Sequence, residues 1–474
     1  MQPRRLRIAM LALHIYAAGA GVLAVLLAST ASLGSLDPIA QFRWIAAGSV
    51  AAIGSLIAIS GVWSTAGVYA AVFGCFHFGF VIVLACGYVT PADVSPWDEG
   101  WVMSAFAADA AVLALAGALA FACGVCLVYA QRTDLWLRDQ QQRARMATVH
   151  SHGVAGTVLV FGALAVWGAI VLATGGITGF FASYADYLDS TSEFGPVLAV
   201  VWPVLGCGIV MAVTGRPGWH RHAAILAFAC FALVGLPLGL RSEVMFPGVV
   251  VLIALARCGR GITLVKAGAV GLAALLIIPL VRDLRTTGIS GLADAELSAP
   301  GLDGLAEMGG SLHPVEKVVR WHAEGEPFEM GATYWAPFER AAARLLPGLR
   351  RRAAAEDDFR LMNVLVLDRV GAIGFSPVAE AYRNFGPIGV VVLLGLLGIV
   401  MGAIDTIRDS QTAVLVIATV YVPLLINVRN SFVSVPAQCV AGLVIVIVVA
   451  ISHHVVGSVL SRPYARAAYV RSEI

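Results

Sequence analysis

Arginines stand where three apolar segments of this chain end. Arg241 follows one segment in GLRSE, and Arg282 and Arg285 follow another in VRDLR. Arg429 follows a third in INVRNS, next to Asn430. A guanidinium is always charged and can donate two parallel N–H bonds to a phosphate or carboxylate. Gathered at one membrane face, these groups would bind a diphosphate; alternatively, each arginine only anchors the chain among lipid headgroups.

A second polar cluster lies in AEAYRNFG, directly before an apolar run that starts at residue 387. Glu380, Arg383 and Asn384 are spaced i, i+3 and i+4, so they share one face of a helix. The Glu380 carboxylate could orient an arginine or accept a proton from a hydroxyl group, with Tyr382 beside it. A local ion pair with a helix cap is the structural alternative.

Other acids and histidines are weaker candidates for catalysis. Glu243 lies two residues after Arg241 and is close enough in sequence to orient or neutralise it. Several further side chains could act as a general base, but their spacing selects none and a solvated surface explains each: His313, His322, Glu324, Glu326 and Glu329. Cys123 and Cys126 form a CxxC inside an apolar run without flanking ligands, which favours small buried side chains over a metal site.

Motifs for nucleotide or metal chemistry do not occur. The sequence has no Walker loop and no dinucleotide fingerprint, which disfavours ATP-driven transport by this chain. No metal-ligand spacing stands out, and nothing points to nucleic acid. We therefore predict no metal and no cofactor.

The elements that position these residues are membrane helices. The chain is 59% hydrophobic and 13% charged, outside the usual range of soluble proteins. A hydrocarbon core of about 30 Å needs about 20 apolar residues per helix, and such runs recur, which predicts an all-α polytopic membrane protein with about 12 transmembrane helices. The predicted spans are roughly 8–30, 44–61, 66–89, 101–130, 153–173, 195–213, 222–240, 243–257, 263–281, 387–404, 412–428 and 435–456.

The distribution of basic residues predicts the orientation. If the N-terminus is cytoplasmic, the short connections on the opposite side hold only Arg43, Arg241 and Arg429, while the remaining short connections and both tails are rich in arginine. We expect both termini in the cytoplasm, and a retained signal-anchor helix after the basic start, Met1 to Arg7. The chain then divides into helices 1–9 (1–281), a large extracytoplasmic loop (282–386), and helices 10–12 with a cytoplasmic tail (387–474).

The long loop is predicted to be partly helical. Residues 282–330 are rich in Gly, Asp and Glu and are expected to be irregular. Residues 333–346 should form an amphipathic helix with Trp335 and Phe338 on one side. A second helical stretch covers 357–370, and Ser376 followed by Pro377 is typical of a helix start.

The order of these features resembles the Wzy-type polymerases of O-antigen and other oligosaccharide repeat units. The similar segments are GLRSEVMFPGVVVLIAL, VRDLR, GATYWAPFERAAARLLPGLR, GFSPVAEAYRNFGPIGVVVLLGLLG and the RNS of 429–431, and the resemblance covers roughly residues 220–440. It implies a glycosyltransferase of the polymerase and ligase branch of the GT-C superfamily. The expected site is the bacterial inner membrane, where such an enzyme acts in exopolysaccharide synthesis.

The resemblance also implies a reaction and residue roles. A growing glycan would move from undecaprenyl diphosphate to the non-reducing end of another lipid-linked unit. The candidates to hold the diphosphate are Arg241, Arg282, Arg285, Arg429, Arg383, Asn384 and Asn430. Glu380, Glu243 and Tyr382 would position or activate the acceptor. Expected partners are lipid-linked oligosaccharides and membrane lipids, with a chain-length regulator and a flippase as further ones.

Three alternatives remain at this level. A metal-dependent GT-C enzyme would carry paired acids in its first outer loop, where SLGSLDPIAQFR holds only Asp37. A transporter or flippase of lipid-linked oligosaccharides would favour charges midway along several helices, a place where only Asp109 qualifies. An O-antigen ligase would handle the diphosphate in the same way and differ in its acceptor.

Overall fold

The computed structural model describes residues 2–28, 38–88, 101–131, 152–259, 302–345, 357–371, 373–407 and 410–451, with scattered residues between 263 and 276. Within these ranges the chain is helical and contains no strand, so the prediction of an all-α polytopic membrane protein is confirmed. Arg282 and Arg285 lie outside the described residues, as does most of the ninth predicted span.

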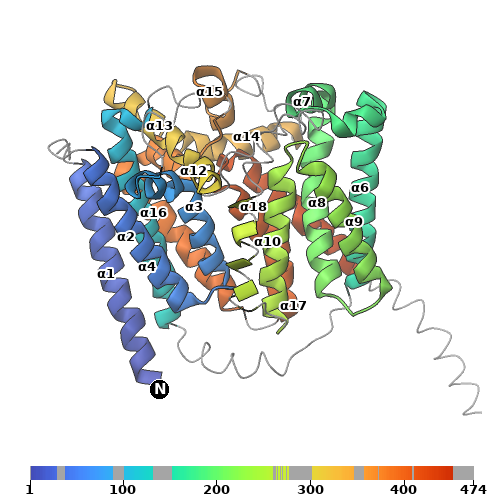
Figure 1. Ribbon diagram of the computed structural model, residues 1–474, viewed down its shortest axis with the longest axis horizontal. Helices are drawn as coiled ribbons and strands as arrows, with labels where there is room; N and C mark the ends of the chain where they lie inside the picture. The colour runs from blue at the N-terminus through green and yellow to red at the C-terminus, as the bar shows by residue number, and fades with distance from the viewer. Residues whose placement is uncertain are drawn as a thin grey trace, which may run out of the picture.

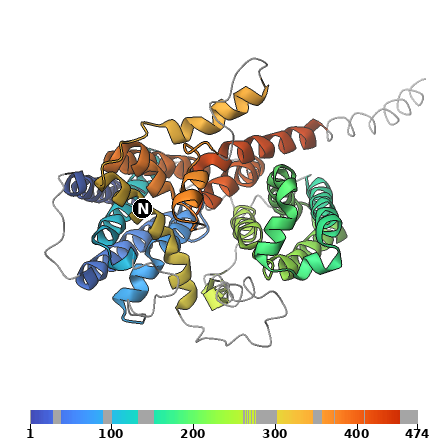
Figure 2. The same ribbon diagram turned by 90° about the horizontal axis from the view of Figure 1, so that it is seen from above.

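Two groups of long helices make up the body of the protein (Figures 1 and 2). In the first group, α1 and α16 pack along α4, and α2 packs on α3. Its helices are α1 (Gln2–Ala28), α2 (Pro38–Ser60), α3 (Thr65–Ala85), α4 (Ala105–Gln131) and α16 (Pro377–Asp405). In the second group, α6 packs against both α8 and α9, with the short α7 at one end. Its helices are α6 (Gly153–Gly175), α7 (Tyr184–Thr191), α8 (Gly195–Thr214) and α9 (Trp219–Gly235).

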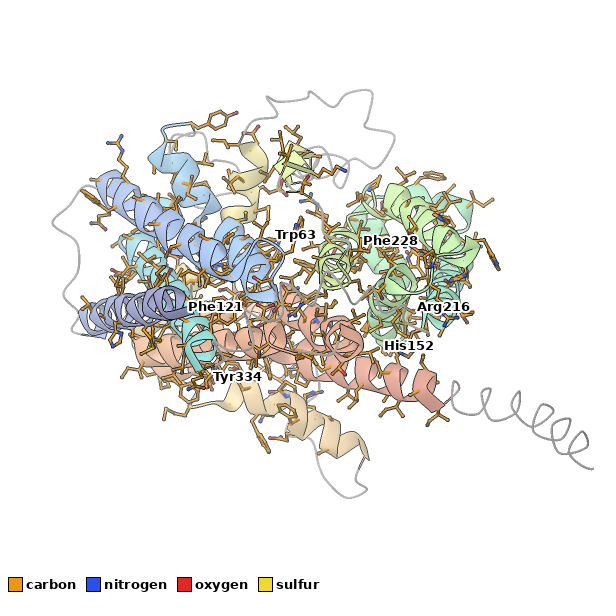
Figure 3. All side chains as sticks on the ribbon, turned by 90° about the horizontal axis from the view of Figure 1, so that it is seen from below. Trp63, Phe121, His152, Arg216, Phe228 and Tyr334 are labelled. Atoms are coloured by element: carbon orange, nitrogen blue, oxygen red, sulfur yellow. The ribbon has the colours of Figure 1, made fainter. Side chains whose placement is uncertain are left out.

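Each group has its own hydrophobic core. Phe121 of α4 belongs to the first core and Phe231 of α9 to the second. Figure 3 shows Phe121 and Phe228 in these separate groups. Helix α10 (Arg241–Arg257) lies between them and contributes Phe246 to the first core and Val244 to the second.

Seven helices among the described residues are long and apolar enough to cross a membrane. They run over Ala40–Ser60, Thr65–Ala85, Ala105–Gln131, Gly153–Gly175, Tyr184–Thr214, Pro377–Asp405 and Phe432–Ile451. Shorter apolar helices occupy Ala12–Leu23, Trp219–Gly235 and Thr412–Ile426. Helices thus cover the predicted spans apart from 263–281, while the total of about 12 crossings stays a prediction.

The loop residues form a layer over one end of the body, which we call the loop end (Figure 1). The start of α1 lies at the opposite end. The layer contains α12 (Asp303–Met308), a 3₁₀ turn (Gly309–Leu312), α13 (His313–Ala323), α14 (Ala332–Leu345) and α15 (Met362–Arg369). The expectation that residues 282–330 are irregular is therefore wrong for 303–323, because packing against α3 and α4 outweighs a glycine-rich composition.

Helix α16 begins as its sequence predicts. The Ser376 hydroxyl accepts a hydrogen bond from the Val378 N–H, which confirms the N-cap with proline at the first position. The helix then kinks at Gly386, directly before Pro387. Only Gly386 leaves helical geometry, with φ 65°, and the chain resumes a helix at once as far as Asp405. This kink separates the polar AEAYRN segment from the apolar remainder.

A buried carboxylate joins four helices at the end opposite the loop layer. Asp405 accepts hydrogen bonds from Tyr129, from the backbone N–H groups of Thr65 and Ala66, and from Arg257 at 3.0 Å. Both charged side chains are 6% exposed. Because the carboxylate is fully hydrogen-bonded, the pair is tolerated inside the bundle, and it ties together α3, α4, α10 and α16.

The helix that leads to Arg429 changes its pitch. It runs through α17 (Ser410–Val416), a wider π-helical turn (Ile417–Tyr421) and α18 (Val422–Ile426). The π turn lies at the junction with α8 and α10. Such turns are rare and often occur near functional sites.

Candidate functional site

A cavity of about 630 Å³ lies at the loop end between the two helix groups. Helices α3, α7, α10, α12 and α15 line it, together with the turn that follows α18. Its polar lining residues include Arg241, Ser242, Glu307, Asn363, Arg429, Asn430 and Ser431. Its apolar lining residues include Val72, Phe76, Met245, Phe246, Val249 and Leu275.

Arg241 is the first residue of α10, so its side chain and the helix N-terminus lie together. The residue before it provides no side-chain cap, so the first-turn N–H groups keep their partial positive charge. The guanidinium donates one hydrogen bond, from Nη1 to Glu307. Its Nε and Nη2 are buried and have no hydrogen-bond partner among the described residues. Within the described part of the chain, two donors of this cation thus have no acceptor.

Glu307 reaches the cavity because α12 lies directly on α3. An added Cβ at Gly79 would come within 2.2 Å of the Leu305 carbonyl oxygen, and one at Gly309 within 2.0 Å of the Phe80 nitrogen. Only glycine permits this approach of two backbones. Glu307 Oε1 accepts the bond from Arg241, while Oε2 is buried without a partner in the described structure.

Arg429 approaches the same cavity from the turn after α18. Its carbonyl oxygen accepts a hydrogen bond from the Phe375 N–H at 2.9 Å. Its guanidinium carbon lies 5.8 Å from the centre of the Phe76 ring, an arrangement in which the ring face attracts the cation. The cavity therefore brings together two arginines that are far apart in the sequence.

The structure gathers some of the residues singled out from the sequence around this cavity and not others. Arg241, Arg429 and Asn430 line it. Glu243 does not; its Oε2 accepts a hydrogen bond from Ser242 on the neighbouring position. Glu380, Tyr382, Arg383 and Asn384 also lie outside the lining.

Glu380 and Asn384 form a closed network with helix α14. Thr333 donates to Glu380 Oε1 at 3.0 Å, and the Phe432 N–H donates to Oε2 at 2.7 Å. Asn384 donates to Thr333 at 2.7 Å and accepts from the Gly331 N–H at 2.9 Å. Glu380, Asn384 and Thr333 are fully buried. These polar groups bind other parts of the chain, and Glu380 connects α16 directly to the segment after Arg429.

Arg383 and Tyr382 face the stretch between α13 and α14. Arg383 pairs with Glu326 and, at 2.9 Å, with Glu329. Burial alone would raise the pKa of Glu326, but hydrogen bonds from Arg369 and Arg383 lower it. Tyr382 packs against the His322 and Phe328 rings.

A separate charged cluster lies where α13 meets the start of α4. Glu316 is fully buried and accepts hydrogen bonds from Ser104 and Arg320. His313 stacks on Trp101 with ring centres 5.0 Å apart. Burial, with the charges of Lys317 and Arg320, lowers the pKa of His313 to about 3. The imidazole is therefore neutral at physiological pH.

The sequence did not single out Glu307 or Asn363, which both line the cavity. Neither stands in a recognisable motif. Glu307 falls in the stretch expected to be irregular, so only the packing of α12 on α3 reveals its place. Within the described ranges, no group of three His, Cys, Asp or Glu side chains is arranged to share a metal ion.

Comparison with known proteins points to one family. The profile of the O-antigen polysaccharide polymerase Wzy family matches residues 64–456. Protein CapE of Staphylococcus aureus is 26% identical over 264 residues, which cover 55% of this chain and 58% of CapE. The chain thus spans little more than half the length of this relative. No solved structure matches.

Proposed function

We propose that this chain, which belongs to the O-antigen polysaccharide polymerase Wzy family, joins lipid-linked oligosaccharide repeat units end to end. The donor would be a growing glycan on undecaprenyl diphosphate. The acceptor would be the non-reducing end of an incoming lipid-linked unit. The observation that carries the proposal is that Arg241 and Arg429 line one cavity of about 630 Å³.

The cavity has the amphipathic lining that a lipid diphosphate requires. Arg241 and Arg429 supply positive charge, and Asn363 adds a polar group. The apolar wall formed by Val72 of α3 and Met245 and Val249 of α10 suits isoprenoid carbon. Nε and Nη2 of Arg241 have no partner among the described residues and would donate to two phosphate oxygens once the substrate displaces the side chains that cover them.

The bonds exchanged define what these groups must do. An acceptor hydroxyl oxygen attacks the anomeric carbon, the bond from that carbon to the diphosphate oxygen breaks, and undecaprenyl diphosphate leaves with the electron pair. The hydroxyl proton passes to the departing phosphate or a nearby carboxylate. Negative charge grows on the diphosphate as the bond breaks, so fixed guanidinium donors stabilise the transition state more than the ground state. Since the diphosphate is already a good leaving group, no nucleotide sugar takes part.

We assign Glu307 the role of pairing with Arg241 until the diphosphate binds. Its carboxylate pairs with Arg241 and neutralises its charge. An arriving diphosphate would compete for the same guanidinium. This exchange keeps a desolvated cation paired before and after binding, because an unpaired buried charge is costly.

The AEAYRNFG cluster is assigned to positioning. Glu380 links Thr333 of α14 to the backbone of Phe432, three positions beyond Arg429. Arg383 pairs with Glu329 before Gly331, and Asn384 accepts from the Gly331 N–H and donates to Thr333 after it, so the two side chains fix this stretch of the loop. Tyr382, Glu243, Arg282 and Arg285 remain candidates for contact with the sugar or the diphosphate.

The orientation follows from the sequence. We infer that the chain lies in the bacterial inner membrane with both termini in the cytoplasm and the loop end outside, where flipped lipid-linked units arrive. A reporter fused after Gly325 should then read extracytoplasmic; a cytoplasmic signal would invert this orientation. A flippase and a chain-length regulator are proposed partners.

One experiment separates the enzyme from its rivals. Purified protein in liposomes is mixed with lipid-linked repeat units and no nucleotide. New glycosidic bonds, seen as a ladder of products with release of undecaprenyl diphosphate, are expected. Movement of intact units across the bilayer without new bonds would favour a flippase. Transfer only onto an added lipid A–core acceptor would favour a ligase.

A further inference from the structure

Helix α14 presents its apolar side outward and its polar side to the protein. Trp335 is 64% exposed and Phe338 46% exposed. Thr333 and Arg340 are buried on the opposite side, together with Ala336. The sequence predicts an amphipathic helix here, and in water such a helix covers its apolar side. The observed arrangement is the reverse.

Specific bonds fix this orientation. Thr333 bonds to Glu380 and Asn384 of α16. Arg340 pairs with Asp358 at 3.2 Å. Tyr334 packs edge-on against Phe432, with ring centres 5.3 Å apart, and Figure 3 shows Tyr334 between α14 and the helix body. A rotation of α14 that buried Trp335 would break all of these contacts.

The exposed side of α14 belongs to a larger apolar surface, which we call the interface patch. Its members are Phe328 (41% exposed), Met330 (75%), Trp335 (64%), Phe338 (46%), Phe385 (39%) and Ile388 (67%). Phe385 packs against Gly331, and Phe328 packs against Gly386. The stretch before α14 and the kink of α16 therefore form one continuous surface.

The interface patch continues into the outer side of a membrane-spanning helix. Ile388, Val392, Leu396 and Val400 follow one another at intervals of four residues along α16, and all are exposed. In a helix this spacing places them on one stripe. Since Pro377–Asp405 is long and apolar enough to span the bilayer, we expect this stripe to face lipid. The patch lies where the stripe reaches the loop end.

We propose that α14 lies in the interfacial layer of the membrane leaflet on the loop side, with Trp335 and Phe338 inserted among the lipids. Tryptophan and other aromatic side chains are enriched at this depth. Arg340, Asp358 and Arg360 bond on the protein side of the helix and leave the apolar side to the bilayer. This inference does not depend on the reaction performed in the cavity.

The anchored helix would also fix the position, relative to the membrane surface, of the turn that carries Arg429 at the cavity. Helix α14 contacts Phe432 through Tyr334 and Phe338. Phe432 is bonded to Glu380 and lies three residues beyond Arg429. The position of the leaflet surface is thereby transmitted to the turn that carries Arg429.

Photo-crosslinking tests the inference. The full-length protein is prepared with p-benzoylphenylalanine in place of Phe338 and, as the matched control, in place of Glu324. Glu324 is exposed, follows α13 in the same loop layer and lies outside the interface patch. Both proteins are reconstituted in liposomes of phosphatidylethanolamine and phosphatidylglycerol, illuminated, and analysed by peptide mass spectrometry. The Phe338 position replaces one exposed aromatic group by another, so the fold is not challenged.

The expected result is a phospholipid adduct at position 338 in several-fold excess over position 324. Equal, low adduct yields at both positions would mean that α14 faces water and would overturn the proposal. Crosslinks from position 338 to a second copy of the chain would mean that protein covers the patch, which overturns it as well.

Discussion

The Glu380 carboxylate accepts a hydrogen bond from the Phe432 backbone N–H at 2.7 Å, although 52 positions separate the two residues. Its other oxygen accepts from Thr333. A side chain that the sequence suggests as a proton acceptor is thus enclosed and holds the segment that carries Arg429. A proton acceptor and a positioning residue are expected to respond differently to substitution.

Replacing Glu380 tests positioning against proton transfer. Glutamine can still accept from Phe432 and can donate to Thr333, so Glu380→Gln should retain most polymerase activity. Glu380→Ala leaves the buried Thr333 hydroxyl and the half-buried Phe432 N–H unpaired, at a cost of about 1–3 kcal/mol for the buried donor, and should lose polymer formation and thermal stability. Activity is measured as the rate of product laddering, and stability as the melting temperature. If both variants were equally inactive and both folded normally, a base role would be favoured.

Lysine in place of either cavity arginine should nearly abolish catalysis. Lysine keeps the charge but cannot offer two parallel donors. Arg241→Lys and Arg429→Lys should each lower kcat by about 10²- to 10³-fold, the usual effect of losing one transition-state donor. Arg369→Lys is the control, because Arg369 pairs with Glu326 outside the cavity. Normal laddering in either cavity variant, at equal membrane levels, would refute the diphosphate clamp.

Removing the negative charge of Glu307 should strengthen substrate binding. The carboxylate and the diphosphate would compete for Arg241, so Glu307→Gln should lower KM about tenfold, equivalent to ~1.4 kcal/mol, with little change in kcat. Steady-state kinetics with purified lipid-linked units measure both constants. A large fall in kcat with unchanged KM would instead identify Glu307 as the proton acceptor.

Acid should destabilise the loop layer through His313. Its pKa is about 3 in the folded protein, against 6.5 for an ordinary histidine. Below pH 6.5 the unfolded chain binds a proton that the folded chain does not, so stability falls as the pH drops from about 6.5 toward about 3. At pH 5 the loss should be about 2 kcal/mol.

The control for this pH effect keeps the stacked ring. His313→Phe retains a flat side chain on Trp101 but cannot bind a proton. Its melting temperature should change less between pH 7 and pH 5 than that of the unaltered protein. An equal change in both proteins would assign the acid sensitivity to other groups.

Local patterns in the sequence predicted well which segments are helices, but they did not predict which of these helices pack against each other. Apolar runs mark the spans because the bilayer fixes the length of a helix, and Ser376 with Pro377 marks a helix start by local chemistry alone. That Arg241 and Arg429 line one cavity depends on how distant helices pack, and so does the contact of Glu307 on α12 with Arg241. No local pattern encodes such contacts.

The interior and exterior sides of α14 show a second limit. The alternation of Trp335 and Phe338 with polar residues predicts that one side is apolar, and this is correct. It does not say whether that side meets protein or lipid. The orientation of α14 is fixed by Thr333 and Arg340, because they bond to Glu380 and Asp358 in other segments of the chain.

The direction of the Arg429 side chain depends on how many residues the wider π-helical turn at Ile417–Tyr421 contains. Such a turn holds one residue more than the α-helical path, and each residue of an α-helix advances the direction of a side chain by about 100°. Deleting a single residue there would rotate the following residues about the helix axis, while the side chains themselves stayed the same. When relatives of this chain are aligned, a one-residue gap at this place would therefore signal a re-aimed cation and should not be dismissed as a neutral difference in length.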